Sequence, residues 1–319
     1  MTETNPLESV VNLISNPSDT PLNRSVLDIR TAGQWATDAK LKPKPDGLYE
    51  PFWMEGELCC LFADSNLGKS ILAVQIADAI SHFCPVIYFD FELTDKQFQM
   101  RYTDDSGHLY TFDERFLRAE LRPDLAVGCE LDDLLIEEME RVVLERGVKV
   151  MIVDNLTYLC AESERGDAAG QLMLKLMQLK KKYGLSILVI AHTPKRVQGT
   201  PLSANDLAGS KKLFNFFDSV FAIGRCMSDS NLRYIKQLKV RQGKFTYDAD
   251  SVLICEIAQR QCLLQFLAKG TGQEKKLIQQ SADELHQKVL DLKEQGMTVR
   301  AISEQLGVSR SRVGRWVNP

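Results

Sequence analysis

Short apolar runs alternate with amphipathic segments from residue 57 onward, and this alternation predicts the elements of the core. The runs that we interpret as buried strands are "ELCCLFA", "PVIYFDFE", "VKVMIVD" and "LSILVIAH". Between them, "SILAVQIADAISHF", "DDLLIEEMERVVLERG" and "GQLMLKLMQLKKKYG" have the apolar content and spacing of helices. Strands that are buried on both faces and alternate with helices are typical of a parallel sheet with helices on both sides. We therefore predict an α/β fold with a mainly parallel central sheet.

The segments on either side of this core predict the domain limits. Residues 1–45 are polar and rich in proline, so we expect an N-terminal arm or linker with one short helix at Val26–Lys40. The runs "SVFAIGR", "RYIKQLKVR" and "SVLICEI" predict further strands that extend the sheet by hairpin pairing. Composition becomes polar after residue 268. We expect an α/β domain over 46–268, a linker over 269–280 and a small helical domain over 281–319.

Composition narrows the classes of function. The chain has 319 residues and a formal net charge of −4, so any surface for nucleic acid must be local. Its eight cysteines form no CxxC pair and lie mostly in apolar runs, which favours buried thiols in a reducing compartment. No signal pattern opens the sequence, and no apolar run approaches the ~18 residues that span a bilayer. We expect a cytoplasmic protein without membrane contact.

The stretch "FADSNLGKS" follows the first predicted strand and fits the phosphate-loop pattern AxxxxGK[ST]. In such a loop, Gly68 lets the backbone approach a phosphate, Lys69 supplies a cation, and the Ser70 hydroxyl ligates Mg²⁺. Ala63 stands where glycine is usual, but it lies at the strand exit, away from the phosphates. A degenerate loop is the alternative. We expect a nucleotide site formed by Ala63, Asp64, Ser65, Asn66, Leu67, Gly68, Lys69 and Ser70.

Three further polar residues lie at predicted strand ends. Asp154 ends "KVMIVD", where it can bind Mg²⁺ or merely cap a turn. Glu92 ends "PVIYFDFE", where it can orient or deprotonate an attacking water, with Asp90 as its rival and a helix-capping role as the alternative. His192 ends "LSILVIAH", where it can sense the γ-phosphate or be an ordinary surface residue.

Taken together, these residues resemble the RecA-like ATPase core. Among proteins with this core, they are most similar to the hexameric replicative helicases of the DnaB type and the plasmid-encoded RepA-type helicases. The resemblance covers roughly residues 50–268. It rests on "FDFELTDKQFQMR", "VMIVDNLTYL", "DLAGSKKLFNFFDSVFAIGR" and "KQLKVRQGK", besides the phosphate loop. It implies a RecA-like P-loop NTPase fold that binds ATP and Mg²⁺, with Lys69, Glu92 and His192 in the catalytic site.

The same resemblance implies that the protein works as an oligomer. In this family a Lys/Arg pair on a late strand reaches the nucleotide of the neighbouring subunit. The resemblance thus implies Lys239 and Arg241 as catalytic residues and a homo-oligomer in the form of a hexameric ring. An exposed basic strand edge is the alternative for this pair. The loop after His192 would face a central channel, where Lys195 and Arg196 could bind single-stranded DNA.

The C-terminal stretch "MTVRAISEQLGVSRSRVGRW" resembles a helix-turn-helix of the bacterial regulator and resolvase type. Ile302 and Leu306 form an apolar pair on its first helix, and Arg310, Arg312 and Arg315 project from the second, where they could contact duplex DNA. A helical bundle for protein contact is the alternative. These features favour a DNA-associated motor or helicase-like ATPase. The alternative is an ATP-switched DNA-binding regulator, or a replication or mobilisation accessory protein, that does not unwind DNA.

Overall fold

The computed structural model describes residues 27–122, 131–155, 166–194, 196, 199–207, 211–279, 282–306 and 308–317. The chain divides into two compact units, Met1–Lys44 and Pro45–Pro319. In the first unit, helix α2 (Ala32–Lys40) starts after Thr31, whose hydroxyl accepts a hydrogen bond from the backbone N–H of Gln34. The helix that we predicted from Val26 therefore starts several residues later.

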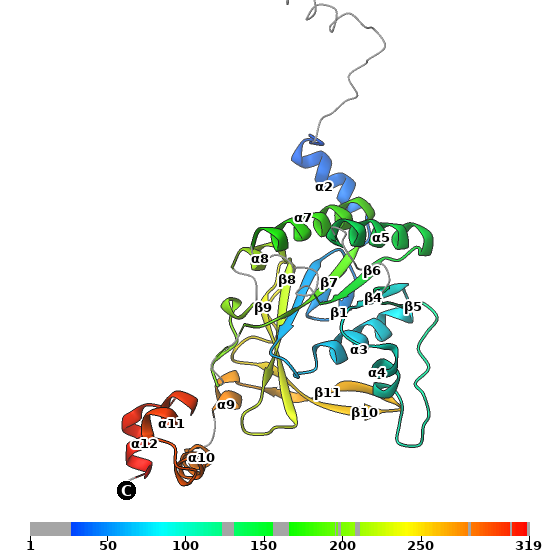
Figure 1. Ribbon diagram of the computed structural model, residues 1–319. Coiled ribbons are helices and arrows are strands. Elements are labelled where there is room, and N and C mark those ends of the chain that lie inside the picture. Colours follow the sequence, from blue (N-terminus) through cyan, green and yellow to red (C-terminus); the bar gives the residue numbers. More distant parts are fainter. Residues whose placement is uncertain are drawn as a thin grey trace, which may run out of the picture. The chain divides into compact units, whose positions relative to one another are not determined.

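The described residues of the second unit form a nine-stranded sheet and a two-stranded sheet (Figure 1). The order of the large sheet is β11-β10-β9-β8-β3-β7-β6-β4-β5. In chain order its strands are β3 (Leu58–Ala63), β4 (Val86–Asp90), β5 (Phe116–Ala119), β6 (Val150–Asp154), β7 (Ser186–His192), β8 (Ser219–Arg225), β9 (Leu232–Lys239), β10 (Val252–Arg260) and β11 (Leu263–Gly272). The small sheet pairs β1 (Gly47–Tyr49) with β2 (Trp53–Met54).

The direction of the strands divides the large sheet into two parts. From β8 to β5 every described pair is parallel, whereas β8, β9, β10 and β11 pair antiparallel with one another. The mainly parallel sheet and the hairpin pairing of its later strands are therefore confirmed. Strands β5 and β11 were not predicted. β5 has only four residues, and the apolar run that begins β11, Leu263–Ala268, was not assigned to a strand.

Helices cover both faces of the sheet, and the central strand β3 contributes to both cores. Leu58, Cys60 and Phe62 pack into one hydrophobic cluster, and Cys59, Leu61 and Ala63 pack into the other. The first cluster lies under α5 (Leu131–Arg146), α7 (Gly166–Tyr183) and α8 (Lys211–Phe216). The second lies under α3 (Lys69–Ser81) and the turn after α4 (Asp95–Arg101), which are on the other side of the sheet in Figure 1. All six residues of β3 are buried, which explains why its sequence shows no polar alternation.

Residues 269–280, which we predicted as a linker, contain regular secondary structure. Strand β11 continues to Gly272, and helix α9 (Glu274–Ile278) follows immediately. Glu274 is only 1% exposed, and its carboxylate accepts hydrogen bonds from the Tyr234 hydroxyl at 3.0 Å and from the Leu202 N–H at 2.7 Å. The polar composition was misleading because Glu274, one of four charged residues in this segment, is buried and paired.

Lys236 on β9 completes this buried cluster. Its Nζ lies 2.5 Å from Glu274 Oε2 and donates to the Leu202 carbonyl at 2.9 Å. The ion pair joins α9 to β9 and to the segment that precedes the short 3-10 helix η1 (Ala204–Asp206). A buried carboxylate and ammonium are tolerated only when each is paired and hydrogen-bonded, and both conditions hold here.

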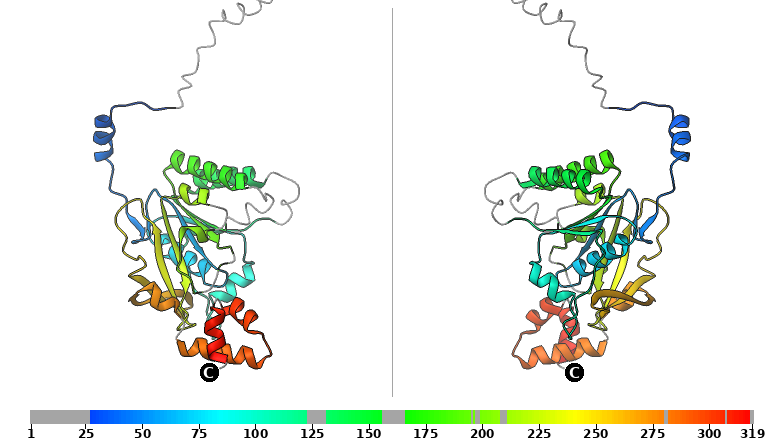
Figure 2. Two further views of the ribbon diagram at one scale, coloured as in Figure 1. Left: turned by 90° about the vertical axis from the view of Figure 1, so that its left-hand side faces the viewer. Right: turned by 90° about the vertical axis from the view of Figure 1, so that its right-hand side faces the viewer.

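The C-terminal residues form three helices with a core of their own, α10 (Ala282–Glu294), α11 (Val299–Leu306) and α12 (Arg310–Val317). Val289, Ile302 and Val313, one from each helix, are buried together with Val308, which lies between α11 and α12. These helices lie within the segment that we predicted as a helical domain, and Figure 2 gives two further views of them. In the described part of the chain, every helix is too short or too polar to cross a bilayer.

We expect the Lys236→Met variant to lose about 3–5 kcal/mol of unfolding free energy, because it leaves the Glu274 carboxylate charged, buried and unpaired. Urea denaturation followed by circular dichroism measures this loss. The matched double variant, Lys236→Met with Glu274→Gln, removes both charges but keeps an acceptor for Tyr234 and Leu202. It should recover most of the loss. A double variant as unstable as the single one would contradict the ion-pair explanation.

Candidate functional site

The predicted phosphate loop joins β3 to α3. Its backbone explains why position 68 requires glycine and why alanine is tolerated at position 63. Gly68 has φ of +93°, and a Cβ there would lie 2.8 Å from Ile257 Cδ1. Any other residue would therefore be strained and crowded. Ala63, in contrast, is the last residue of β3 and pairs regularly with His192 and Ile223. Position 63 has ordinary strand geometry, so it does not require glycine.

Lys69 is the first residue of α3 and is held inside the loop. Its Nζ donates to the carbonyl oxygens of Ala63 at 3.1 Å and Asp64 at 3.3 Å. Burial lowers the pKa of Lys69, while the carboxylates of Asp154, Glu92 and Asp64 oppose that shift. The ammonium is thus fixed at the mouth of the loop, where a phosphate oxygen would be a stronger partner than the two carbonyls.

Asp154 ends β6 beside the loop and is 1% exposed. The Tyr88 hydroxyl donates to its Oδ2 at 2.5 Å, whereas Oδ1 is buried without a hydrogen-bond partner among the described residues. Burial raises the pKa of Asp154 to about 6, although the hydroxyls of Ser70 and Tyr88 favour its charged form. An unsatisfied buried carboxylate oxygen beside the Ser70 hydroxyl is a suitable pair of oxygen ligands for Mg²⁺.

The described residues contain no group of three or more His, Cys, Asp or Glu side chains that could hold a metal ion alone. This finding fits Mg²⁺ in a nucleotide site, because Mg²⁺ there takes one or two protein ligands and fills its other positions with water and phosphate oxygens. Ser70 and Asp154 therefore fit the ion, provided that the nucleotide brings the remaining ligands.

Glu92 lies at the same edge of the sheet, in contact with two other polar side chains. Its Oε1 is 3.1 Å from His192 Nε2, and the Asn155 amide nitrogen donates to the same carboxylate oxygen. That amide nitrogen is also 2.9 Å from His192 Nε2. The three side chains come from the carboxyl ends of β4, β6 and β7, which lie side by side in parallel register.

Asp90, the rival of Glu92, has a different role in the structure. Its side chain is fully buried, Oδ1 accepts the N–H groups of Glu92 and Leu93, and Oδ2 accepts from Arg118 at 2.8 and 3.0 Å. Since β4 ends at Asp90, Glu92 lies beyond the strand and no longer follows its alternation. Asp90 positions the turn that carries Glu92, and its oxygens are not available to a water.

A pocket of about 470 Å³ brings most of these residues together. It is lined by Lys69, Ser70, Glu92 and His192, and also by Ser65, Asn66 and Gly68 of the loop. Asp64 and Leu67 belong to the same loop, but Leu67 is buried in the core and Asp64 accepts a hydrogen bond from the Thr193 hydroxyl. The site thus combines a loop, a cation and a carboxylate around one space.

Two residues of this site were not among the predicted site residues. Arg101, at the end of α4, lines the pocket, and its Nη1 is buried without a hydrogen-bond partner among the described residues. Asn155 contacts both Glu92 and His192. For Asn155 the signal was its position directly after Asp154. For Arg101 it was the resemblance of "FDFELTDKQFQMR" to the helicase stretch in which Gln and Arg follow a catalytic glutamate at fixed offsets.

Lys239 and Arg241 do not lie near the phosphate loop of their own chain. Lys239 Nζ donates to the carbonyls of Phe214 and Asn215 at the end of α8. Arg241 pairs with Asp218 at 3.0 Å, and Asp218 also accepts the N–H of Leu58, the first residue of β3. The loop follows the other end of β3, roughly 16 Å away at about 3.3 Å per residue. Both cations therefore lie at the opposite edge of the sheet.

The basic residues predicted for the channel loop differ in their surroundings. Lys195 lies outside the described residues. Arg196 has a side chain only 12% exposed, and its Nη2 donates to Thr200 and to the Pro201 carbonyl, while its Nε lies 3.6 Å from Asp206. Arg196 thus holds its own loop in shape.

The three arginines that we predicted to contact duplex DNA, Arg310, Arg312 and Arg315, are exposed on α12, while Val313 of the same helix is buried. Arg312 lies over the Trp316 ring at 4.6 Å, Arg310 is 3.6 Å from Glu304, and Arg315 donates to the Ser311 carbonyl. Their heads remain accessible at the surface. The arrangement suits contact with phosphates or base edges.

Two known families match the chain, one over the α/β part and one over the C-terminal helices. The AAA domain family matches residues 26–198, more than half of the chain. The chain belongs to the AAA domain family. This AAA protein is a RecA-like P-loop ATPase, as its motifs implied, and its C-terminal residues 282–318 match the homeodomain-like domain, a helix-turn-helix.

Among solved structures, the AAA protein is similar to the KaiC-like protein PH0186 from the hyperthermophilic archaeon Pyrococcus horikoshii OT3. The identity is 13%, the TM-score is 0.49, and the alignment covers 67% of this chain and 91% of that one. No curated protein matches the sequence.

We expect the Asp154→Asn variant to be more stable than the parent at pH 8 in EDTA, and equally stable at pH 4. Asp154 has a folded-state pKa of about 6, above the unfolded value near 4, so ionisation costs the folded state free energy above pH 6 and nothing below pH 4. Urea unfolding at the two pH values measures the difference, on the order of 2 kcal/mol. Equal stability at pH 8 would contradict the burial cost.

Proposed function

We propose that this AAA protein is a DNA-associated motor or helicase-like ATPase that hydrolyses ATP at the interfaces between its own copies. The observation that carries the proposal is the division of the site between two edges of the sheet. Lys69, Glu92 and His192 line one pocket, whereas Arg241 lies at the far edge and can reach a nucleotide only in another copy.

Within one chain, the phosphate loop would hold the triphosphate through its N–H groups and Lys69. Ser70 and Asp154 would hold Mg²⁺, which draws charge from the phosphates when bound. Glu92 would orient the attacking water and take its proton. His192 and Asn155 touch the Glu92 carboxylate, so they can pass a change at the γ-phosphate to the loop after β7.

Between chains, Arg241 and Lys239 would meet the phosphates bound by the neighbour. Such an interface is heterologous, since one face presents the pocket and the other presents the cations. Heterologous interfaces form a ring when the rotation between subunits closes, and an open filament when it does not. We propose the closed ring. A hexameric ring would place the loops after β6 and β7 around a channel for single-stranded DNA. Lys195 is the basic residue we propose there, and Arg196 supports the shape of the same loop.

The C-terminal helix-turn-helix favours a second candidate function. A domain with exposed Arg310, Arg312 and Arg315 can bring the ATPase to duplex DNA without any unwinding. The protein would then be an ATP-switched DNA-binding regulator, or a replication or mobilisation accessory protein. Strand displacement on a forked duplex separates the two, because only the motor releases the strand.

We expect Lys69→Ala and Arg241→Ala each to lose ATP hydrolysis when assayed alone. Mixed in equal amounts, the two variants should recover activity, because a pocket from Arg241→Ala can meet the intact arginine of a Lys69→Ala neighbour. Random mixing leaves about a quarter of the interfaces intact when each interface joins two faces in a head-to-tail contact. Phosphate release measures the recovery.

The control for this mixing experiment is Lys69→Ala with Glu92→Gln. Both changes lie in the same half-site, so no interface in that mixture has an intact pocket, and it should remain inactive. Recovery in the control, or no recovery in the first mixture despite intact assembly, would contradict the division of the site between copies.

Replacing Arg312 by Ala should weaken binding to duplex DNA and lower the salt dependence of that binding. Each lost phosphate contact reduces the slope of log K against log salt by about 0.9. Fluorescence anisotropy with a labelled duplex measures the slope. Arg146→Ala, at the exposed end of α5, is the matched control and should leave it unchanged.

A further inference from the structure

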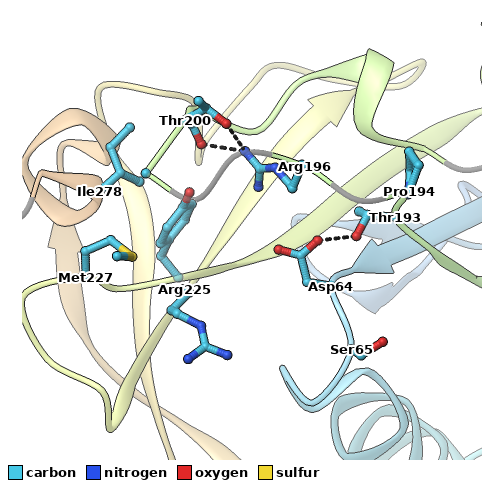
Figure 3. A pocket seen from close by; sticks show the side chains of 11 residues that line it. Asp64, Ser65, Thr193, Pro194, Arg196, Thr200, Arg225, Met227 and Ile278 are labelled. Atoms are coloured by element: carbon cyan, nitrogen blue, oxygen red, sulfur yellow. Dashed lines mark hydrogen bonds between the residues drawn. The ribbon is translucent and has the colours of Figure 1, made fainter. Parts of the chain in front are cut away.

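A second pocket, of about 440 Å³, lies beside the phosphate loop and shares only Ser65 with the nucleotide pocket (Figure 3). Asp64, Ser65 and Thr193 form one wall, and Arg225 stands on the opposite wall with Met227 and Ile278. The nucleotide site does not use this space. Its position between the loop and the ends of β7 and β8 connects it to both.

Arg225 is the exposed cation of this pocket. It ends β8, and it makes no hydrogen bond or ion pair with any residue that the structure describes. In the β8–β9 pair it lies directly opposite Arg233, whose Nε is buried without a partner among the described residues. Like charges that face each other across two strands are destabilising. Arg233 Nη1 is held by the carbonyls of Ser230 and Leu232. An anion bound to Arg225 in the pocket would therefore reduce this repulsion.

The remaining surface of the pocket is suited to more than a bare anion. Met227, Ile278 and the ring of Tyr234 form an apolar floor. The Tyr234 ring is fixed in place, because it lies against Gly224 and its hydroxyl is bonded to Glu274. A cation above a rigid apolar floor fits one phosphate with the sugar or base attached to it.

We propose that this pocket binds one phosphodiester unit of a single-stranded nucleic acid, with Arg225 as the phosphate ligand. The proposal rests on the proposed function as a DNA-associated ATPase and adds a site to it. A free nucleotide offers the same phosphate chemistry, but Asp64 on the opposite wall would repel its several negative charges. A phosphodiester carries one charge, which Arg225 can match.

The pocket also has a direct contact with the nucleotide site. The Thr193 hydroxyl donates to Asp64, and Asp64 offers its carbonyl to Lys69. Thr193 follows His192, so the two sites share both the loop and the end of β7. A strand held against Thr193 therefore acts on the backbone that holds Lys69. Binding of strand and nucleotide is thermodynamically coupled, and the coupling is reciprocal.

The test measures binding of fluorescent oligo(dT) to the full chain across a range of salt concentrations. All variants carry Arg310, Arg312 and Arg315 replaced by Ala, so that the helix-turn-helix does not contribute. Arg225→Ala should weaken binding about tenfold, the loss of one charge-assisted contact. It should also lower the salt slope by about 0.7, the value for one phosphate of a single strand. Arg225→Lys should keep the slope, and Arg146→Ala should change neither quantity.

A second variant tests the pocket without changing Arg225, in case Arg225→Ala misfolds. Met227→Glu leaves the arginine in place but puts a negative charge in the pocket, so it should also weaken oligo(dT) binding. Hydrolysis of ATP without DNA should be unchanged in Arg225→Ala. An unchanged slope would overturn the proposal, and so would an equal loss of affinity for a fluorescent ATP analogue, which would assign the pocket to free nucleotide.

Failure of the pocket proposal can be distinguished from failure of the ATPase proposal. If the parent chain hydrolyses no ATP but its oligo(dT) affinity depends on Arg225, the ATPase proposal fails and the pocket remains. If the parent hydrolyses ATP, and oligo(dT) stimulates this hydrolysis equally in the parent and in Arg225→Ala, the proposal for the pocket fails and the ATPase proposal remains.

Discussion

The parallel register of β3 between β7 and β8 is the constraint on which the rest of the site depends. Since these strands run in one direction, their carboxyl ends meet at one edge, and Ala63 pairs there with both His192 and Ile223. Burial of β3 on both faces prevents the register from slipping, because a shift of one residue would exchange its two cores. Asp154 and the turn that holds Glu92 are brought to the same edge by the register of β6 and β4.

The charged groups at this edge are held in states that are unfavourable without a ligand. Burial raises the pKa of Asp154 and lowers the pKa of Lys69, so each group is less easily charged than in water. Both charges would gain a partner if a nucleotide and its cation bound here, as proposed. Relief of this cost would then contribute to the binding free energy, and perturbed pKa values of this kind cluster at functional sites.

Much of the fold could be predicted from the sequence, because the core strands are continuous apolar runs and the helices between them are amphipathic. The proximity of Lys69, Glu92, Asp154 and His192 also followed, since residues at the ends of parallel strands must lie close together. Their catalytic roles stay predictions.

Long-range pairing was harder to predict. Glu274 and Lys236 look like solvent-exposed charges in the sequence, and only the fold brings them together in the interior. For the same reason the segment 269–280 resembled a linker. Asp90 and Glu92 could not be separated by alternation, because the strand ends between them and the contact from Arg118 comes from β5, a strand that the pattern did not reveal.

The pairing of Arg241 with Asp218 has a consequence for how activity would depend on the amount of protein. In an isolated chain the guanidinium stays with Asp218, at the edge of the sheet away from its own loop. If Arg241 serves a neighbouring copy, as proposed, the specific ATPase activity rises with protein concentration. Dilution then abolishes hydrolysis without an inhibitor. A cell could then set the output by expression level alone, with a threshold near the dissociation constant of the assembly.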